Sequence, residues 1–328
     1  MKYNVDRLLE IVDKFSGKKV GIIGDIMLDR FTYGDITRVS PEAPGIILKE
    51  SGNLETPGGA GNVAKNIVNL DGIPYLIGII GDDHEGWILR KVMKKNNIDD
   101  SYLITKKGGI TTLKERFIDN RYKQQLFIRR DREDDKQNID FEKFKNTLKD
   151  LVNKSDIIVI SDYNKGVCKE DVCKYIIDLS NSIGKKVIVD PKNNLGKFRG
   201  AYLIKPNKNE IELNIGKYEN NKEKIYNLIK ELCINAMIVT KGEEGLSIFE
   251  NGKCIDIPAI GDGQIVDITG AGDSVIAGLS LSLASNSSLE EAAYISNTIG
   301  GLVVRKPGTA TVTRDELKEA LKKYYKQC

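Results

Sequence analysis

Short apolar runs alternate along the chain with stretches whose apolar residues have helical spacing. The runs span two to five residues and occupy residues 20–23, 76–80, 157–160, 187–189, 203–204 and 237–239. Continuous runs of this kind are typical of strands that are buried on both faces of a parallel sheet. Residues 170–182 and 222–232 show the helical spacing. The alternation predicts an α/β fold with a doubly wound, mostly parallel sheet flanked by helices.

Two segments, residues 31–57 and 111–133, break this alternation. Each contains strand-like runs where a crossover helix is expected, at residues 46–48, 113–118 and 125–129. We expect a small β-sheet that is inserted twice into a single domain over residues 1–328. Such an element over the main sheet is a natural lid, because it excludes water from a site beneath it.

Polar residues follow directly after most of the predicted strands. Ligands of open α/β sheets bind beyond the carboxyl ends of the strands, so these residues are candidates for one site. Each of them also fits an ordinary turn or helix cap when it is taken singly. The candidates are Asp25, Asp29, Asp162, Lys165, Asn207, Glu210, Thr240 and Gly242.

These candidates offer complementary chemistry. Asn207 and Glu210 are three residues apart, so they share a helical face and are able to hold Mg²⁺ through water. Thr240 and Gly242 offer a hydroxyl and accessible backbone to a nucleotide. The other members suit a polyol: Asp25 or Asp29 accepts hydrogen bonds from its hydroxyls, and Asp162 and Lys165 meet hydroxyls or a phosphate.

Residues 267–273 carry the most informative motif, Asp-Ile-Thr-Gly-Ala-Gly-Asp. They follow an apolar stretch at 264–266, which we expect to be a strand, and they open a predicted helix at 274–284. Gly270, Ala271 and Gly272 leave backbone N–H groups bare at the helix start, which forms an anion site. A carboxylate at Asp273 repels a phosphate there unless it takes a proton from an attacking hydroxyl. The motif therefore predicts phosphoryl transfer to an alcohol with Asp273 as the base. The plainer alternative is a tight turn before an aspartate that favours the helix dipole.

A second glycine-rich segment lies at residues 57–64. Its Gly59-x-Gly61-x-x-Ala64 spacing formally matches the dinucleotide-binding fingerprint, but the residues before it are polar and end in Pro57. We favour a loop that opens a helix at 62–70. There the backbone of Gly58 and Gly59 approaches a sugar and Asn62 bonds its hydroxyls. A P-loop motif is absent from the sequence, and an NAD-dependent dehydrogenase remains a remote alternative.

Composition narrows the class of protein further. Lys and Arg number 50 against 47 Asp and Glu, and this net charge of +3 gives no reason to expect nucleic acid or a membrane as a partner. His84 is the single histidine, which leaves little for a Ser-His-Asp triad or a multi-histidine metal site. The five cysteines lack paired spacing, and neither a signal peptide nor a transmembrane run is present. We expect a cytoplasmic protein.

Three motifs resemble the signatures of the ribokinase-like (PfkB) carbohydrate kinases: residues 57–62, residues 267–273 and the Asn-x-x-Glu at 207–210. The resemblance extends from about residue 18 to residue 313. It implies a ribokinase-like fold with a β-sheet lid, Asp273 as base and Gly270, Ala271 and Gly272 as the anion hole. It also implies Mg²⁺ near Asn207 and Glu210, and a homodimer through the lid. ATP contacts are implied at Asn207, Thr240, Gly242, Gly245 and Asn297, and a monovalent cation such as K⁺ at Asp267, Thr269 and Gly308.

Residues 24–30, 38–44 and 161–166 resemble, more narrowly, the heptose 7-phosphate kinase branch of that family. This resemblance implies ATP-dependent phosphorylation of the anomeric hydroxyl of D-glycero-D-manno-heptose 7-phosphate, which gives the 1,7-bisphosphate. The sugar-binding residues implied are Asp25, Asp29, Gly58, Gly59 and Asn62. Basic candidates for the distal phosphate are Arg38, Lys114, Arg116, Arg129 and Lys165. The nucleotidyltransferase that is often fused in this branch is not expected here. A kinase of the same fold for another sugar or sugar phosphate is the alternative.

Overall fold

The main body of the protein is built on a nine-stranded sheet. The computed structural model describes residues 4–122, 126–134, 141–219, 221–261 and 264–325. The strand order is β13-β12-β11-β10-β9-β8-β1-β4-β5, and all pairs are parallel except those of β12 with β11 and β13. The strands are β1 Lys19–Gly24, β4 Ile73–Gly81, β5 Leu103–Lys106, β8 Ile157–Ser161, β9 Val187–Asp190, β10 Leu203–Ile204, β11 Ala236–Thr240, β12 Leu246–Glu250 and β13 Lys253–Ile257.

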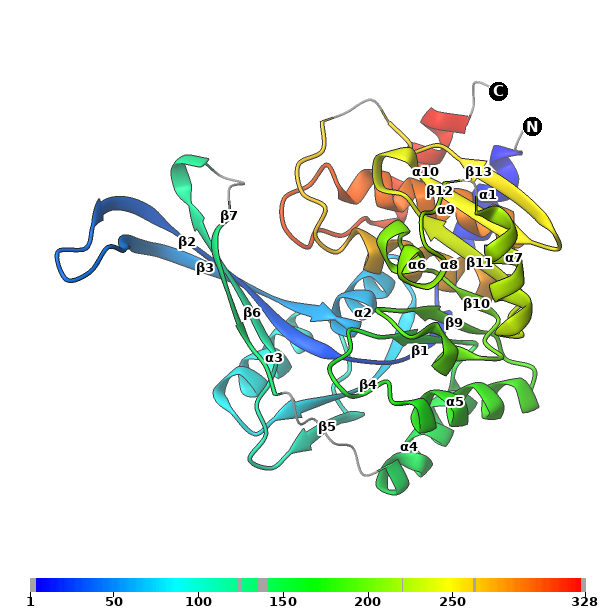
Figure 1. Ribbon diagram of the computed structural model, residues 1–328, viewed down its shortest axis with the longest axis horizontal. Coiled ribbons are helices and arrows are strands. Elements are labelled where there is room, and N and C mark those ends of the chain that lie inside the picture. Colours follow the sequence, from blue (N-terminus) through cyan, green and yellow to red (C-terminus); the bar gives the residue numbers. More distant parts are fainter. Residues whose placement is uncertain (1–3, 123–125, 135–140, 220, 262–263, 326–328) are drawn as a thin grey trace.

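Helices cover both faces of this sheet (Figure 1). Alternate residues of one strand enter different cores: Ile157 and Val159 of β8 join one apolar cluster, and Ile158 and Ile160 join the other. This two-sided burial explains why the strands are continuously apolar, and the predicted fold class is confirmed. The helices are α1 Val5–Asp13, α2 Ala60–Asn69, α3 His84–Lys95, α4 Phe141–Lys154, α5 Glu170–Ser182, α6 Lys208–Ile215, α7 Lys222–Glu231, α8 Ala271–Ala284, α9 Leu289–Val303 and α10 Arg314–Tyr325.

One short stretch differs from the prediction. Residues 264–266, expected to be a strand before the anion motif, have no regular secondary structure. Val266 instead donates its backbone N–H to the carbonyl oxygen of Val304, just after α9, at 2.8 Å. The segment borders the end of a helix, so no strand is available to pair with it. In the described part of the chain, we find no helix with both the length and the apolar character that crossing a bilayer requires.

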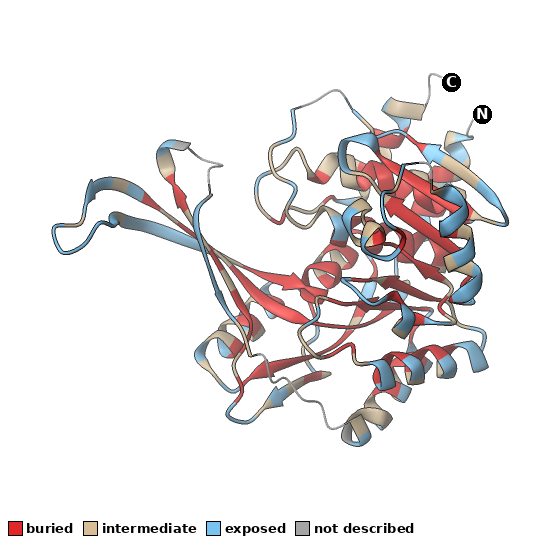
Figure 2. Ribbon diagram, viewed as in Figure 1, coloured by how far each residue is buried: buried red, intermediate tan, exposed pale blue. Residues whose placement is uncertain are grey.

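A separate four-stranded sheet, called the small sheet below, projects from the main body (Figure 1). Its order is β3-β2-β6-β7, formed by β2 Ile26–Val39, β3 Ile46–Gly59, β6 Leu113–Asp119 and β7 Leu126–Arg132. Figure 2 shows that the inner parts of β2 and β3 are buried and the outer parts exposed. The sheet is made from the two segments for which the sequence predicts a lid, and its action as a lid stays a prediction.

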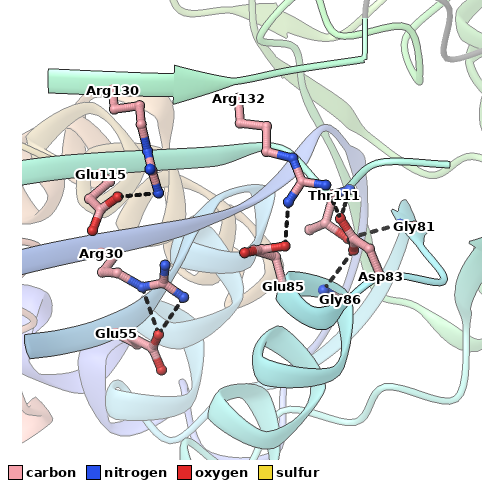
Figure 3. A network of polar contacts seen from close by, with 10 residues as sticks. All are labelled: Arg30, Glu55, Gly81, Asp83, Glu85, Gly86, Thr111, Glu115, Arg130 and Arg132. Atoms are coloured by element: carbon pink, nitrogen blue, oxygen red, sulfur yellow. Dashed lines mark hydrogen bonds and ion pairs between the residues drawn. The ribbon is translucent and has the colours of Figure 1, made fainter.

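Ion pairs join the base of the small sheet to the start of α3 (Figure 3). Arg132 of β7 contacts Glu85 at 2.5 Å and Asp83 at 3.4 Å. Asp83 also caps α3 through the N–H of Gly86 and accepts a hydrogen bond from the hydroxyl of Thr111 at 2.6 Å. These contacts fix the position at which β6 and β7 leave the main body.

Candidate active site

Asp273 is the third residue of α8. The helix follows Gly270, whose φ of 78° lies in the left-handed region, and a Cβ at this glycine would lie 2.5 Å from Nδ2 of Asn62. Glycine is therefore required at Gly270 both for the turn and for the close approach of Asn62. The N–H of Ala271 donates to the carbonyl oxygen of Ile268 at 3.2 Å, so this member of the predicted anion site is already bonded. The first N–H groups of a helix lack acceptors within the helix, so the N–H of Gly272 remains able to receive an anion.

The carboxylate of Asp273 is held by donors from two distant segments. Oδ1 accepts a hydrogen bond from the hydroxyl of Tyr163 at 2.6 Å, and Oδ2 accepts one from Nδ2 of Asn62 at 2.7 Å. Asp273 is only 4% exposed. Burial raises its pKa to about 6, although the bonds from Tyr163 and Asn62 and the charge of Lys205 oppose the rise. A carboxylate with a pKa in this range is suited to general-base work near neutral pH.

A cavity of about 1000 Å³ lies beside the start of α8 and beyond the carboxyl ends of β8 to β11. This volume is at the upper end of the range typical of small-molecule sites. The structure brings together nine of the residues that the sequence selects for the site. The nine that line the cavity are Asp162, Asn207, Glu210, Thr240, Gly242, Gly245, Ala271, Gly272 and Asn297.

Asn207 and Glu210 form a reciprocal capping box at the start of α6. Oδ1 of Asn207 accepts the N–H of Glu210, and Oε2 of Glu210 accepts the N–H of Asn207, both at 2.9 Å. The other carboxylate oxygen of Glu210 lies 3.5 Å from Nζ of Lys192. The Asn-x-x-Glu spacing thus has a helix-capping role that our reading of the sequence did not assign. Because capping uses only Oε2, the oxygen Oε1 of Glu210 remains available at the cavity as a ligand atom for a metal ion.

The sequence reasoning assigned no role to two charged cavity residues, Asp190 and Lys205. Lys205, only 2% exposed, forms an ion pair with Oδ1 of Asp190 at 2.9 Å. A Cβ built on Gly272 would lie 3.7 Å from Nζ of Lys205, so a buried cation borders the start of α8. Burial raises the pKa of Asp190 to about 7, and Lys205 opposes this rise. Asp190 is the last residue of β9 and Lys205 directly follows β10, so both stand at the carboxyl end of a strand, which is the signal that selected the other candidates.

Asp25 organises the loop after β8. Its Oδ2 accepts the backbone N–H groups of Tyr163 at 2.8 Å and Lys165 at 3.0 Å, and its Oδ1 accepts that of Val167 at 3.0 Å. Asp162, in the same loop, forms an ion pair with Lys197 at 2.7 Å. The structure therefore gives Asp25 and Asp162 internal partners, and their contact with a sugar stays a prediction.

One face of the small sheet presents charged residues toward this loop. Asp29 pairs with Lys114 across β2 and β6, and Arg116 pairs with Arg129 across β6 and β7. Lys114 and Arg116 are two residues apart, so all four side chains lie on one face. Arg116 contacts Asp29 at 2.8 Å, and Nζ of Lys114 lies 5.3 Å from the centre of the Tyr163 ring. The structure thus brings these predicted residues next to the loop that carries Tyr163.

The opposite face of the small sheet carries separate ion pairs (Figure 3). Arg30 contacts Glu55 at 2.8 Å, and Arg130 contacts Glu115 at 2.6 Å. Because side chains alternate between the two faces of a strand, these charges point away from the face that carries Lys114. They hold strands of the small sheet together outside the candidate site.

The profile of the pfkB family carbohydrate kinases matches residues 18–316. The chain belongs to this family. It is 36% identical over 308 residues to the bifunctional protein HldE of a Nitratiruptor species, covering 92% of this chain and 64% of that protein. It is 37% identical over 319 residues to the bifunctional protein HldE of a Caulobacter species, covering 95% of this chain and 64% of that protein. The chain therefore spans about 64% of the length of these curated relatives.

Solved structures share the fold at lower identity. Phosphofructokinase-2 from Escherichia coli in complex with potassium superposes with a TM-score of 0.75 at 20% identity, over 94% of this chain and 99% of that one. Ribokinase from Arabidopsis thaliana complexed with ribose and ATP gives 0.70 at 17% identity, also over 94% and 99%. These structures confirm the predicted ribokinase-like fold, and the family profile over residues 18–316 confirms the carbohydrate kinase class.

Residues 57–59 of the glycine-rich segment, for which the sequence predicts a loop, are the end of β3, and α2 begins directly after them at Ala60. A Cβ at Gly58 would lie 2.2 Å from Oδ2 of Asp29, so only glycine allows the two strands to approach here. Asn62 is fully buried, and its Oδ1 has no hydrogen-bond partner among the described residues. Gly59 ends β3, which is antiparallel to β2, so α2 does not follow a strand of the parallel sheet as the helix after a dinucleotide-binding turn does.

Asp267 gathers the three residues predicted to hold a monovalent cation. Its Oδ1 accepts the N–H of Thr269 at 2.8 Å, and its Oδ2 accepts the N–H of Gly308 at 3.0 Å. The proximity of these residues follows from the structure, whereas cation binding stays a prediction.

Arg38 lies apart from the other basic candidates, and Lys165 lies in the loop after β8 that carries Tyr163. Arg38 is exposed on the outer part of β2, nine residues beyond Asp29, which corresponds to roughly 30 Å of strand. Lys165 forms an ion pair with Glu133, just after β7. Arg129 contacts Asp131 at 2.9 Å on its own strand. Within one chain, Lys114, Arg116 and Arg129 are the basic candidates that share a single surface.

Proposed function

We propose that this chain transfers the terminal phosphoryl group of ATP to the anomeric hydroxyl of D-glycero-D-manno-heptose 7-phosphate. The observation that carries the reaction type is the placement of Asp273, a buried carboxylate that directly follows the cavity-lining residues Ala271 and Gly272. The substrate is supported by the resemblance of residues 38–44 and 161–166 to the heptose 7-phosphate kinase branch. Identity of 36–37% to proteins named bifunctional HldE is consistent with that branch.

The acceptor sugar is proposed to bind between Asn62 and the charged face of the small sheet. The unpaired Oδ1 of Asn62 supports this, because a buried acceptor without a partner in the protein suits a hydroxyl of a ligand. Lys114, Arg116 and Arg129 supply positive charge for the distal phosphate, and arginine forks suit phosphate oxygens. Asp29, bonded to Arg116, is an acceptor that this surface offers to sugar hydroxyls.

ATP is proposed to occupy the cavity, with its phosphates toward Gly272 and Lys205. The N–H groups at the start of α8 and the buried Lys205 then stabilise negative charge on the transferring group. Thr240, Gly242, Gly245 and Asn297 line the remainder of the cavity. Asn207 and Glu210 would hold Mg²⁺ through water, and this ion would neutralise charge on the phosphate oxygens.

The chemistry then needs few protein groups. Asp273 takes the proton of the anomeric hydroxyl while the sugar oxygen forms a bond to the terminal phosphorus and the bond from that phosphorus to the bridging oxygen breaks. The products are the heptose 1,7-bisphosphate and ADP. Both oxygens of Asp273 already accept one hydrogen bond, and a carboxylate oxygen has capacity for a second. The base can therefore receive the sugar hydroxyl without losing its two donors.

We also propose the finer properties that the family resemblance implies. Asp267, Thr269 and Gly308 would bind K⁺, and the similarity to a phosphofructokinase-2 solved with potassium supports this. A homodimer through the small sheet is supported by its exposed apolar side chains, which include Val39, Phe127 and Ile128. The free cysteines, among them Cys233 and Cys254, fit a reducing compartment such as the cytoplasm.

Substrate assignment is tested by measuring ADP release with a panel of acceptors. Heptose 7-phosphate should give the highest kcat/KM among heptose 7-phosphate, unphosphorylated heptose, fructose 6-phosphate and ribose. The ³¹P spectrum of the product should contain a phosphate on the anomeric carbon. A higher kcat/KM with another acceptor would reassign the substrate, and NADH binding without any phosphoryl transfer would favour the dehydrogenase alternative.

A further inference from the structure

We infer that Tyr163 is a positioning residue for the proposed base: its hydroxyl anchors one carboxylate oxygen of Asp273 from a loop that Asp25 holds in place. The inference rests on the proposed role of Asp273. Tyr163 belongs to the segment 161–166, in which the sequence reasoning selected Asp162 and Lys165 as candidate site residues and gave Tyr163 no role. In the structure, its hydroxyl contacts the carboxylate on which the proposed chemistry depends.

The geometry is that of an oriented carboxylate. The bond from the Tyr163 hydroxyl to Oδ1 of Asp273 is 2.6 Å long, in the range of O–H donors to charged carboxylates. Asn62 bonds the other oxygen from α2 at 2.7 Å. Two donors on opposite oxygens, from elements more than 100 residues apart, fix the rotation of the carboxylate plane. The remaining lone pairs therefore keep a constant direction relative to the start of α8.

The loop that carries Tyr163 is itself fixed. The buried carboxylate of Asp25, just after β1, accepts the backbone N–H groups of Tyr163, Lys165 and Val167. On the side of the small sheet, Lys114 lies over the Tyr163 ring. The position of the hydroxyl is thus defined by the main body and bordered by the surface where the acceptor is proposed to bind.

The electrostatic surroundings indicate what the hydroxyl does. The charge of Lys205 after β10 lowers the pKa of Asp273, and that of Asp29 on β2 raises it. Asp190, the last residue of β9, lies in the same cluster of charges. The donors Tyr163 and Asn62 lower the pKa of Asp273 against the effect of burial. Burial raises the pKa of Tyr163 well above its ordinary value, so the tyrosine remains a donor throughout the working range. Removing its hydroxyl should favour the protonated, inactive form of Asp273.

The kinetic test compares Tyr163→Phe with a matched variant, Tyr102→Phe. Tyr102 also donates its hydroxyl to a carboxylate, that of Asp150 at 2.5 Å, but it lies outside the site. For Tyr163→Phe, the acid limb of kcat/KM should move upward by about one pH unit or more. The loss should therefore be larger at about pH 6 than at about pH 8, with KM for ATP unchanged. An unchanged limb, or an equal loss at every pH, would overturn the inference, and Tyr102→Phe should match the unmodified chain.

A second readout needs no substrate. In protein labelled with ¹³C at aspartate carboxyl groups, the Asp273 signal is assigned by its loss in Asp273→Asn. Its titration midpoint should rise in Tyr163→Phe and fall when Tyr163 is replaced by the more acidic 3-fluorotyrosine, which keeps the ring and the hydroxyl. If Tyr163→Phe does not fold, the titration midpoint of Asp273 in the 3-fluorotyrosine protein alone tests the inference. Midpoints that do not move would overturn the inference. If the unmodified chain phosphorylates no sugar, the proposed function fails while this titration still tests Tyr163.

Discussion

Asp273 combines two properties that usually exclude each other in a carboxylate. It is almost completely buried, which disfavours its charge, and it accepts two hydrogen bonds, which favour that charge. The balance places its pKa at about 6, between an exposed aspartate and a permanently neutral one. Such a group is ionised at neutral pH yet basic enough to remove a proton from a hydroxyl, which is the property that a general base requires.

Replacing this one carboxylate should therefore remove catalysis without removing the fold. Asp273→Asn keeps the size of the side chain but is not basic, so kcat should fall by roughly 10²–10⁴-fold, the usual contribution of general-base catalysis. Binding of an ATP analogue, measured by calorimetry, should remain close to that of the unmodified chain. Asp150→Asn, at an exposed ion pair with Lys154, serves as the control. Turnover of Asp273→Asn near the original value would show that another group accepts the proton.

The raised pKa also predicts the pH dependence. Asp273 is active when deprotonated, so kcat/KM should decrease tenfold for each pH unit below about 6 and level off above it. A sugar phosphate loses its second proton near the same pH, at about 6, and this also produces an acid limb. The residual activity of Asp273→Asn separates the two causes, because the substrate still titrates in that variant. A limb that persists unchanged there belongs to the substrate.

The residues to which the sequence analysis gave no role show what local sequence patterns do not reveal about a site. Asp273, Gly270 and Asn62 belong to glycine-rich motifs, so the neighbouring residues in the sequence identified them as candidate site residues. Tyr163 and Lys205 act through partners that are 110 and 15 residues away in the chain, Asp273 and Asp190. Such contacts depend on which strands are neighbours in the sheet, and local spacing contains no information about strand order.

At the scale of elements, apolar runs identified the strands that are buried on both faces. Burial of alternate residues in two different cores leaves no polar position in β8 before its last residue, so the run is unambiguous. Residues 264–266 contain only two apolar residues, Ile265 and Val266, after Gln264, and they border α9 and pair with no strand. The dinucleotide-like glycines were correctly rejected, because β3 belongs to the small sheet and not to the parallel sheet.

The two faces of the small sheet differ, which allows a sharp test of the distal phosphate site. Lys114→Ala removes a cation from the face near Tyr163, and Arg130→Ala removes one from the opposite face. A hydrogen bond to a charged group contributes about 1.5–3 kcal/mol, so Lys114→Ala should raise KM for the sugar phosphate by roughly 10–100-fold. KM for ATP and for the unphosphorylated sugar should stay unchanged, and Arg130→Ala should alter none of the three.

The outcome for unphosphorylated heptose is the decisive one. If Lys114→Ala raises KM equally for both sugars, the lysine contacts the ring or shapes the loop through Tyr163 instead of binding the phosphate. If Arg130→Ala has the same effect as Lys114→Ala, the change acts through the stability of the small sheet.

At the scale of the whole molecule, the chain is one continuous body from which the small sheet extends (Figure 1). The inner parts of its strands pack on the main body and the outer parts are exposed (Figure 2). The contacts of Arg132 with Asp83 and Glu85 hold the base of this sheet (Figure 3). Its tip has no covering element among the described residues (Figure 2). A long exposed sheet with apolar residues is unusual for an isolated chain, because unprotected strands tend to associate.

These features predict that the small sheets of two chains meet in solution. Light scattering should then give a mass of twice the 36.5 kDa of the chain. Ile128→Glu, at a side chain that is 55% exposed on β7, should produce the monomer, because a charge buried without a partner at an interface is strongly unfavourable. Leu213→Glu is the matched control, since Leu213 is 78% exposed on α6, away from the small sheet. A monomeric unmodified chain, or a dimer that is lost equally in both variants, would show that the small sheet is not the interface.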